Sequence, residues 1–248
     1  MVSCLEAQSY TTRPLVNQVK FDPDQLDLSE MNRRFESATP QEILAWAVAT
    51  IPNLAQMTSF SMGALTHMLY HELQARVPVI FLDTLHLFPE TLETAQKAKG
   101  LYNLDLHVYQ AAPNREHFIG NYGDRLWEKD VVRFHELTKV QPMERALNEL
   151  NIQAWITGRR RDQSTNRQHM PILERATDGR IKINPLANWT HKDIWRYTFT
   201  HGVFYNPLHD QGYTSIGDQP LTTQVQVGED ERAGRWRGSV KTECGIHR

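Results

Sequence analysis

The sequence predicts an α/β protein built on a doubly wound, mostly parallel sheet, with a flexible C-terminal tail. Predicted strands and helices alternate repeatedly between residues 39 and 205. Residues 77–82 form a short apolar run, which is typical of a strand buried on both faces of a parallel sheet. The chain has 248 residues, of which 40% are hydrophobic and 23% charged, so it can bury a core without disulfide or metal cross-links.

The first helix of this pattern has a clear start signal. Thr39 offers a capping hydroxyl, Pro40 suits the first helical position, and Glu42 completes a capping box. Apolar runs, turn residues and caps then predict the remaining elements. These are a strand over 54–60, a helix over 64–74, the strand 77–82, a helix from Pro89, a strand over 104–109, a helix over 142–150, a strand over 154–158 and a helix from Thr190 to Gly202.

The chain divides into three predicted parts. Residues 1–38 are an N-terminal arm, residues 39–205 the α/β domain, and residues 206–248 a mobile C-terminal segment. The last part is rich in Gly, Asp, Gln and Thr and shows little periodicity. Irregular segments of about 45 residues in compact proteins are usually functional lids or disordered.

Composition excludes several classes of protein. The net charge of −2 argues against a wide nucleic-acid footprint. No apolar run approaches the roughly 18 residues of a membrane-spanning helix, and residues 1–20 lack the apolar stretch of a signal peptide. We therefore expect a soluble cytoplasmic protein whose partners include neither nucleic acid nor membrane.

Metal-binding patterns are weak in this sequence. Cys4 and Cys244 lie at opposite ends of the chain with no CxxC pair, and Cys4 reads as an incidental surface thiol. His67 and His71 share one face of a predicted helix, but no third ligand is evident from the sequence. Packing histidines are therefore the favoured interpretation, and no metal is predicted.

The turn after the strand 54–60 is a candidate anion site. Hydroxyls and free backbone N–H groups gather there at a helix N-terminus, which carries a partial positive charge. Serine and glycine would equally suit a turn without a ligand, so both interpretations stay open. The candidate substrate-binding residues of this turn are Thr58, Ser59, Phe60, Ser61 and Gly63.

Two further polar stretches follow predicted strands. Asp83 and Thr84 come after the strand 77–82, and Gly158, Arg160 and Arg161 come after the strand 154–158, with Arg167 close behind. The guanidinium fork matches phosphate and sulfate oxygens, although a solvated basic loop is the alternative. Because the carboxyl ends of parallel strands meet at one edge, all three stretches are expected to line one crevice.

The C-terminal segment carries the candidate nucleophile, Cys244. Positive neighbours favour the thiolate and lower the thiol pKa from about 8.5, and the thiolate is the reactive form. A tail that is basic only for solubility is the alternative, but it does not explain a cysteine beside Gly245. The basic residues assigned to substrate binding here are Arg235, Arg237, Lys241 and His247.

Taken together, these stretches resemble the phosphoadenylyl-sulfate (PAPS) reductases of assimilatory sulfate reduction. The match extends from about residue 40 to the end of the chain, and the Glu-Cys-Gly-Ile-His signature at 243–247 is its most specific element. The resemblance implies an adenine nucleotide alpha hydrolase-like fold and a sulfonucleotide-binding domain over 39–205. The segments that carry it are 58–63, a modified pyrophosphate loop, and 82–91, 158–164 and 241–247.

The related adenylyl-sulfate (APS) reductases hold a [4Fe–4S] cluster with four cysteines. Phe134, His135, Asp218 and Leu221 stand at those four positions here, so no cluster of that type can be ligated and no cofactor is expected. This favours PAPS over APS, and a cluster-free APS reductase is the nearest alternative. An adenylating ATP-pyrophosphatase is less favoured because the loop 58–63 lacks that family's acidic residue, and a nucleotide sensor with a redox-sensitive tail is a further alternative.

The resemblance also implies a mechanism and partners. Cys244 would attack the sulfur of PAPS to give an S-sulfonate, while Lys139, Arg160, Arg161 and the arginines before Cys244 neutralise the nucleotide. The chain has no resolving cysteine nearby, so thioredoxin or glutaredoxin must release sulfite. The C-terminal segment would act as a mobile lid, and a homodimer is the family expectation.

Overall fold

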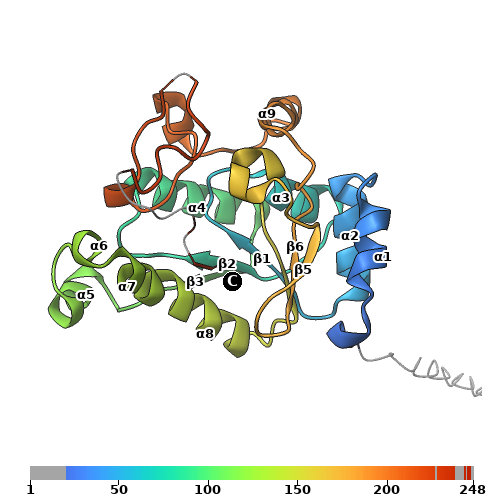
Figure 1. The fold of residues 1–248 in the computed structure, drawn as a ribbon, viewed down its shortest axis with the longest axis horizontal. Coiled ribbons are helices and arrows are strands. Elements are labelled where there is room, and N and C mark those ends of the chain that lie inside the picture. The colour runs from blue at the N-terminus through green and yellow to red at the C-terminus, as the bar shows by residue number, and fades with distance from the viewer. Residues whose placement is uncertain (1–20, 227, 238–242, 244, 247–248) are drawn as a thin grey trace, which may run out of the picture.

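The computed structural model describes residues 21–226, 228–237, 243 and 245–246 of the chain. Within them, six strands form one sheet in the order β3-β2-β1-β4-β6-β5, with helices on both faces (Figure 1). The strands are β1 (Leu54–Thr58), β2 (Val79–Leu82), β3 (Leu106–Tyr109), β4 (Ala154–Ile156), β5 (Leu173–Arg175) and β6 (Ile181–Ile183). The α-helices are α1 (Leu28–Phe35), α2 (Pro40–Thr50), α3 (Ala64–His67), α4 (Pro89–Tyr102), α5 (Arg115–Tyr122), α6 (Leu126–Lys129), α7 (Val131–His135), α8 (Gln141–Glu149) and α9 (His191–Thr200).

Two π turns and several short 3-10 helices complete the structure. The π turns, η2 (Met68–Glu72) and η3 (Glu136–Val140), continue α3 and α7 without a break. The 3-10 turns are η1 (Pro23–Gln25), η4 (Arg161–Gln163), η5 (Thr165–Arg167), η6 (Pro207–Gln211) and η7 (Gln219–Leu221).

The sheet confirms the predicted fold class. β1 lies at its centre and pairs in parallel with β2 and with β4, so chain crossovers leave β1 in both directions. Such a switch point creates a crevice beyond the carboxyl ends of the strands. Only β5 runs antiparallel, against β6. These two three-residue strands were not predicted, because they are too short to show a periodic pattern.

Side chains alternate between the two faces of the sheet, as a period of two residues requires. Leu54 and Ala154 point into the core that α2, α3, α4 and α9 cover. Ala55 and Trp155, one residue further along each strand, point into the core that α8 covers. Both faces are therefore apolar, which explains why the strands read as apolar runs and not as alternating sequences.

The predicted N-terminal arm contains a packed helix. The capping box at Thr39 is present, with both of its hydrogen bonds, and α2 starts there as expected. The preceding helix α1 was not predicted, yet Phe35 is buried against Trp46 at a ring-centroid distance of 5.1 Å. Asn32 also exchanges two hydrogen bonds with the backbone of Leu173 in β5. Phe21 and Leu26, which precede α1, also pack against the core, so the packed part of the described chain begins well before residue 39.

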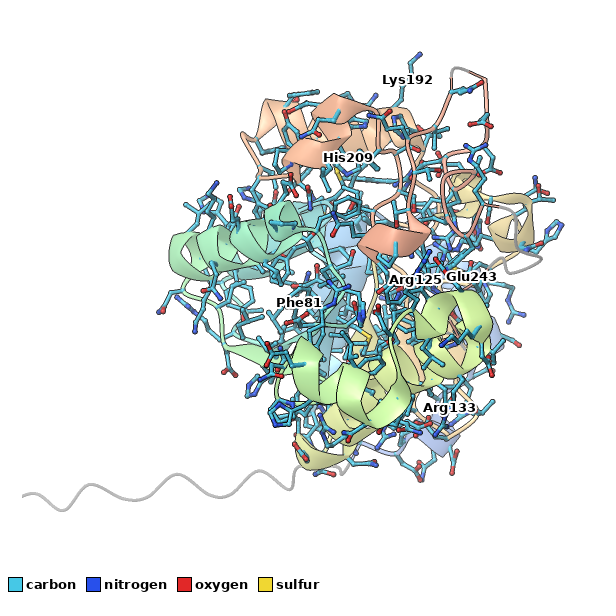
Figure 2. The ribbon with its side chains drawn as sticks, turned by 90° about the vertical axis from the view of Figure 1, so that its left-hand side faces the viewer. Phe81, Arg125, Arg133, Lys192, His209 and Glu243 are labelled. Carbon is cyan, nitrogen blue, oxygen red and sulfur yellow. The ribbon has the colours of Figure 1, made fainter. Side chains whose placement is uncertain are left out.

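The described part of the C-terminal segment is irregular but packed. It lies beyond the strand ends on the side of α4 and α9, where Figure 1 shows it in orange and red. Figure 2 labels His209 in this segment, above Phe81 of the sheet. Leu208 and Ile216 bury their side chains against Phe88 at the start of α4. None of the helices in the described part of the chain combines the length and apolar character needed to span a membrane.

Candidate active site

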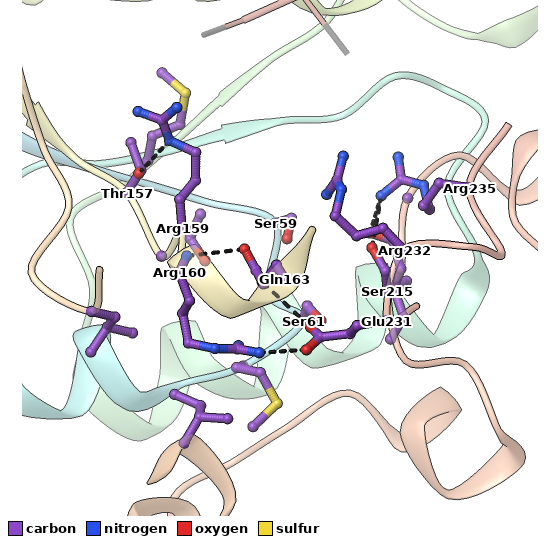
Figure 3. A pocket seen from close by; sticks show the side chains of 18 of the residues that line it. Ser59, Ser61, Thr157, Arg159, Arg160, Gln163, Ser215, Glu231, Arg232 and Arg235 are labelled. Carbon is purple, nitrogen blue, oxygen red and sulfur yellow. Dashed lines mark hydrogen bonds and ion pairs between the residues drawn. The ribbon is translucent and has the colours of Figure 1, made fainter. Parts of the chain in front are cut away.

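A pocket lies at the carboxyl ends of β1, β2 and β4 and is closed from the other side by the C-terminal segment (Figure 3). The strand-end wall contributes hydroxyls and arginines, whereas the opposite wall contributes Ser215, Glu231, Arg232, Arg235 and Trp236. Of the predicted binding residues, those that line this pocket are Thr58, Ser59, Ser61, Thr84, Lys139, Gly158, Arg160 and Arg235. The three predicted stretches therefore do converge on one crevice.

The loop after β1 places its hydroxyls in the pocket by turning sharply. Phe60 adopts a left-handed backbone conformation with φ of 52°, and its N–H donates to the Thr58 hydroxyl at 3.0 Å. Its ring is buried in the core against Phe81 and does not line the pocket. The structure therefore places the Phe60 ring in the core, outside the binding site in which the sequence predicted it. The turn exposes its neighbours instead, and Ser61 Oγ lies 2.9 Å from His209 Nε2 of the C-terminal segment.

Gly63 also has a structural place and does not line the pocket. Its N–H donates to the Phe204 carbonyl at 3.1 Å, and a Cβ at this position would lie 2.6 Å from the Phe204 ring. Only glycine permits this close approach. The glycine of the loop is thus explained by packing between α3 and the chain after α9, and the structure gives it this place outside the pocket lining.

The two residues of the loop after β2 that were predicted to bind substrate lie in different surroundings. Thr84 lines the pocket, but Asp83 does not. The Asp83 carboxylate accepts hydrogen bonds from the Leu85 N–H at 2.9 Å and the Gln110 amide at 2.6 Å. Asp83, predicted as a substrate contact, therefore fixes the shape of its own loop outside the pocket lining.

Three consecutive arginines after β4 point to three different places. Arg159 lines the pocket but pairs with Glu174 of β5, and its Nε donates to Asn184 at 3.2 Å. Arg160 lines the pocket and donates to Glu231 of the opposite wall at 2.5 Å. Arg161 turns away to form a bidentate pair with Glu36.

The structure therefore places Arg161 away from the pocket in which the sequence predicted it. Its guanidinium also donates to the Met170 carbonyl at 2.8 Å, so its donors are engaged outside the pocket. Arg167, which the sequence marked only as a neighbour, lines the pocket instead and is 6% exposed.

Arg167 binds the C-terminal segment directly. Its Nε and Nη2 donate to the two carboxylate oxygens of Glu243 at 2.7 Å and 2.8 Å, and Arg232 approaches the same carboxylate at 3.2 Å. Although burial alone would raise it, the two arginines keep the pKa of Glu243 below its ordinary value. Glu243 is therefore an anion held where the pocket is most basic.

Glu231 has a similar position on the other side of the pocket. Besides Arg160, it contacts His191 Nδ1 at 3.2 Å and the Gln163 amide at 3.4 Å. His191 and Arg160 keep the pKa of Glu231 below its ordinary value, although burial alone would raise it. Sequence reasoning missed Glu231, His191 and His209, because an isolated acid or histidine in an irregular tail or a helix start carries no local signal.

Lys139 lines the pocket and belongs to a buried group of ionisable side chains. Its ammonium pairs with Asp218, which is fully buried and also lies 3.3 Å from His135 Nε2. His135 and Asp218 stand at two of the positions where the cluster-binding relatives are expected to have cysteines, and here their side chains contact each other. Although burial alone would raise it, Lys139 and His135 hold the pKa of Asp218 well below its usual range.

The two remaining arginines of the prediction have different surroundings. Arg235 donates to the Ile216 carbonyl at 3.1 Å and stacks on the Trp236 ring at 4.6 Å, within the pocket wall. Arg237, which the sequence predicted to contact substrate, pairs with Glu229 at the surface and does not line the pocket. Lys241, Cys244 and His247 lie outside the described residues, but Glu243 and Ile246 beside them contact or line the pocket.

The pocket and fold together define a doubly wound α/β protein with a highly basic pocket at the sheet switch point. Its fold resembles the FMN adenylyltransferase of Candida glabrata, with a TM-score of 0.57 over 87% of this chain and 78% of that one, at 14% identity. This likeness concerns the fold alone, which is of the adenine nucleotide alpha hydrolase-like type.

Closer relatives identify the family. The sequence pattern of the phosphoadenosine phosphosulfate reductase domain matches residues 54–224. A probable phosphoadenosine phosphosulfate reductase of Schizosaccharomyces pombe is 44% identical over 92% of this chain and 86% of its own length. The crystal structure of the PAPS reductase of Candida auris, a phosphate complex, covers 80% of this chain and 96% of that chain at 38% identity and a TM-score of 0.72. The chain therefore belongs to the phosphoadenosine phosphosulfate reductase family of oxidoreductases.

Proposed function

We propose that this protein reduces PAPS to sulfite and adenosine 3′,5′-bisphosphate in sulfate assimilation, with thioredoxin or glutaredoxin as electron donor. The observation that carries the proposal is the charge of the pocket. Six lysine and arginine side chains line it among the described residues, against one carboxylate, Glu231. The six are Lys139, Arg159, Arg160, Arg167, Arg232 and Arg235.

The substrate explains this charge. PAPS carries about four negative charges near neutrality if its 3′-phosphate is doubly ionised. Guanidinium groups bind phosphate and sulfate oxygens in a bidentate manner, and they also stabilise charge that develops on a leaving phosphate. The phosphate present in the Candida auris relative is consistent with such a site. The residues proposed to bind the nucleotide are Thr58, Ser59, Ser61, Thr84, Gly158, Lys139, Arg160 and Arg235, together with Lys241 and His247.

The first chemical step is assigned to Cys244. Its thiolate attacks the sulfur of the sulfate group and forms an S–S bond, while the S–O bond to the 5′-phosphate breaks with its electron pair. Adenosine 3′,5′-bisphosphate leaves, and Cys244 carries an S-sulfonate. Support comes from Glu243, which binds two arginines of the pocket, and from Ile246, which lines it.

The second step requires an external dithiol. One thiolate of the donor attacks the Cys244 sulfur, sulfite departs with the electron pair of the S–S bond, and a mixed disulfide forms. The second donor thiol then resolves this disulfide and releases the Cys244 thiolate, so the donor is oxidised by two electrons. Access for the donor demands that the C-terminal segment open after the first step, which is why we propose it as a mobile lid. We also propose that the protein forms a homodimer.

The decisive experiment measures sulfite release from PAPS and from APS with reduced thioredoxin. We expect turnover with PAPS at a kcat/KM well above that for APS, and no turnover by Cys244→Ser. Cys4→Ser is the matched control and should retain full activity. Normal activity of Cys244→Ser would refute the mechanism, and a preference for APS would assign the protein to the cluster-free APS reductases.

The donor can be tested separately. A thioredoxin variant that lacks its second cysteine should be trapped as a mixed disulfide by the sulfonated wild-type protein. Cys244→Ser should trap none. Capture through Cys4 instead would contradict the proposed second step.

A further inference from the structure

Three potential metal ligands meet on the surface formed by α3, η2 and α9. His67, Glu72 and His201 each offer one ligand atom, and these atoms lie within 4.8 Å of one another. His67 is buried, whereas Glu72 and His201 are exposed, so the group opens to solvent. None of the three lines the active-site pocket. The group is therefore separate from the reductase chemistry.

The π turn η2 creates this group. In an α-helix each residue turns by about 100°, so side chains five residues apart would point about 140° away from each other. Hydrogen bonds of a π turn instead join residues five apart, which brings such side chains close to the same line along the helix. His67 ends α3 and Glu72 ends η2, so the wide turn brings the carboxylate toward the imidazole. The sequence pattern could suggest only His67 and His71.

The third ligand comes from another element. His201 directly follows α9, the helix that contacts α3. Its ring lies 5.8 Å from that of His67, measured between centroids. A metal bound here would join the end of α9 to the helix that follows the hydroxyl loop 58–63. Both elements form walls of the pocket, through Ala64 and Leu65 of α3 and through Ile194 and Trp195 of α9.

Two tyrosines hold the proposed ligands in place. The Tyr102 hydroxyl lies 3.1 Å from His67 Nδ1, so one ring nitrogen is engaged and the other remains as a donor atom for a metal. The Tyr197 hydroxyl donates to Glu72 Oε1 at 2.5 Å. Outer hydrogen bonds of this kind orient metal ligands and fix the histidine tautomer.

We propose that His67, Glu72 and His201 bind a zinc ion that links the α3–η2 helix to α9. Two imidazoles and one carboxylate are a ligand set that suits Zn²⁺ and disfavours Mg²⁺ or Ca²⁺, which prefer oxygen ligands. Three protein ligands leave a fourth position for water. The ion stabilises the arrangement of two pocket walls and takes no part in sulfur chemistry.

The test is zinc titration of the full-length protein by calorimetry. Since thiols also bind zinc, every protein in the comparison carries Cys4→Ser and Cys244→Ser. The parent should bind one Zn²⁺ at this site, and added zinc should raise its Tm. His201→Ala and Glu72→Gln should each weaken binding at least about 10- to 100-fold, the loss typical of an outer-shell partner alone.

His71→Ala is the matched control. His71 stacks on His67 at a centroid distance of 4.6 Å on the same helix but is not one of the three ligands. The control should bind zinc like the parent. Absence of stoichiometric binding by the parent would overturn the proposal, as would unchanged affinity in both His201→Ala and Glu72→Gln. His201 and Glu72 are exposed, so neither variant should lower the Tm of the metal-free protein.

Discussion

The two walls of the active-site pocket are held in place by different forces. The strand-end wall consists of loops fixed by the sheet, by short backbone turns and by buried rings such as Phe60. The opposite wall, from the C-terminal segment, is tied down largely by ion pairs. Glu231 pairs with Arg160, which we propose to bind the anionic nucleotide, and Glu243 pairs with Arg167 in the same pocket. Under this proposal the nucleotide and the segment compete for the cations of one pocket, which would give the segment a physical reason to move when ligand binds.

The largest expected effect concerns the buried anchor of the C-terminal segment. Asp218→Ala leaves Lys139 and His135 buried without their carboxylate, and breaking a buried pair typically costs about 3–5 kcal/mol. We expect a loss of this size in the free energy of unfolding, measured with urea. Asp210→Ala removes an exposed carboxylate of the same segment and should change stability by less than about 0.5 kcal/mol. Equal losses would mean that the pair does not anchor the segment.

Two neighbouring arginines test the contribution of the strand-end wall to catalysis. Arg160→Ala should lower kcat/KM for PAPS about 10- to 100-fold, because charge-assisted hydrogen bonds contribute about 1.5–3 kcal/mol. Arg161→Ala should change it by less than about threefold, since its guanidinium binds Glu36 outside the pocket. A larger defect in Arg161→Ala than in Arg160→Ala would contradict the observed orientation of the two side chains.

A buried lysine of the sheet, outside the pocket lining, predicts a pH dependence of stability. Burial, with Arg159 nearby, lowers the pKa of Lys182 in β6 to about 8. Between about pH 8 and pH 10.4 the unfolded chain keeps this proton and the folded chain does not, so stability rises with pH. One proton contributes at most about 1.4 kcal/mol per pH unit. Urea unfolding at several pH values should show this rise in the wild type and not in Lys182→Met. If the free energy of unfolding changed with pH equally in both proteins, Lys182 would not be its source.

The smallest expected effect tests whether Glu243 and the nucleotide compete for the arginines of the pocket. Glu243→Gln removes the charge that pairs with Arg167 and Arg232, so adenosine 3′,5′-bisphosphate should bind several-fold more tightly while kcat falls. A gain of about 0.5–1 kcal/mol corresponds to roughly two- to fivefold. Calorimetry and steady-state kinetics measure the two changes.

Glu229→Gln is the matched control for that substitution. Glu229 forms its bidentate pair with Arg237, at the surface and outside the pocket. Neither nucleotide affinity nor kcat should change. Weaker nucleotide binding by Glu243→Gln would show that Glu243 supports the ligand site and does not compete for it.

Most of the fold could be predicted because its signals are local. Caps and apolar runs marked α2, α4, α8, α9 and four of the strands. The predicted helix over 64–74 was found as α3 followed by η2, since no residue type announces a π turn. The hairpin of β5 and β6 and the short helices α5–α7 were missed, because elements of a few residues depend on tertiary contacts for their stability.

The sequence by itself determined the fold class, the crevice at the strand ends and the family, since these follow from periodicity and from motifs that are continuous in the chain. Only the tertiary structure decided what each charged side chain does. Arg160 and Arg161 are adjacent, yet their partners, Glu231 and Glu36, lie 71 and 125 residues away. Ion pairs form wherever the fold brings opposite charges together, and no pattern of neighbouring residues predicts a partner so far away in the sequence.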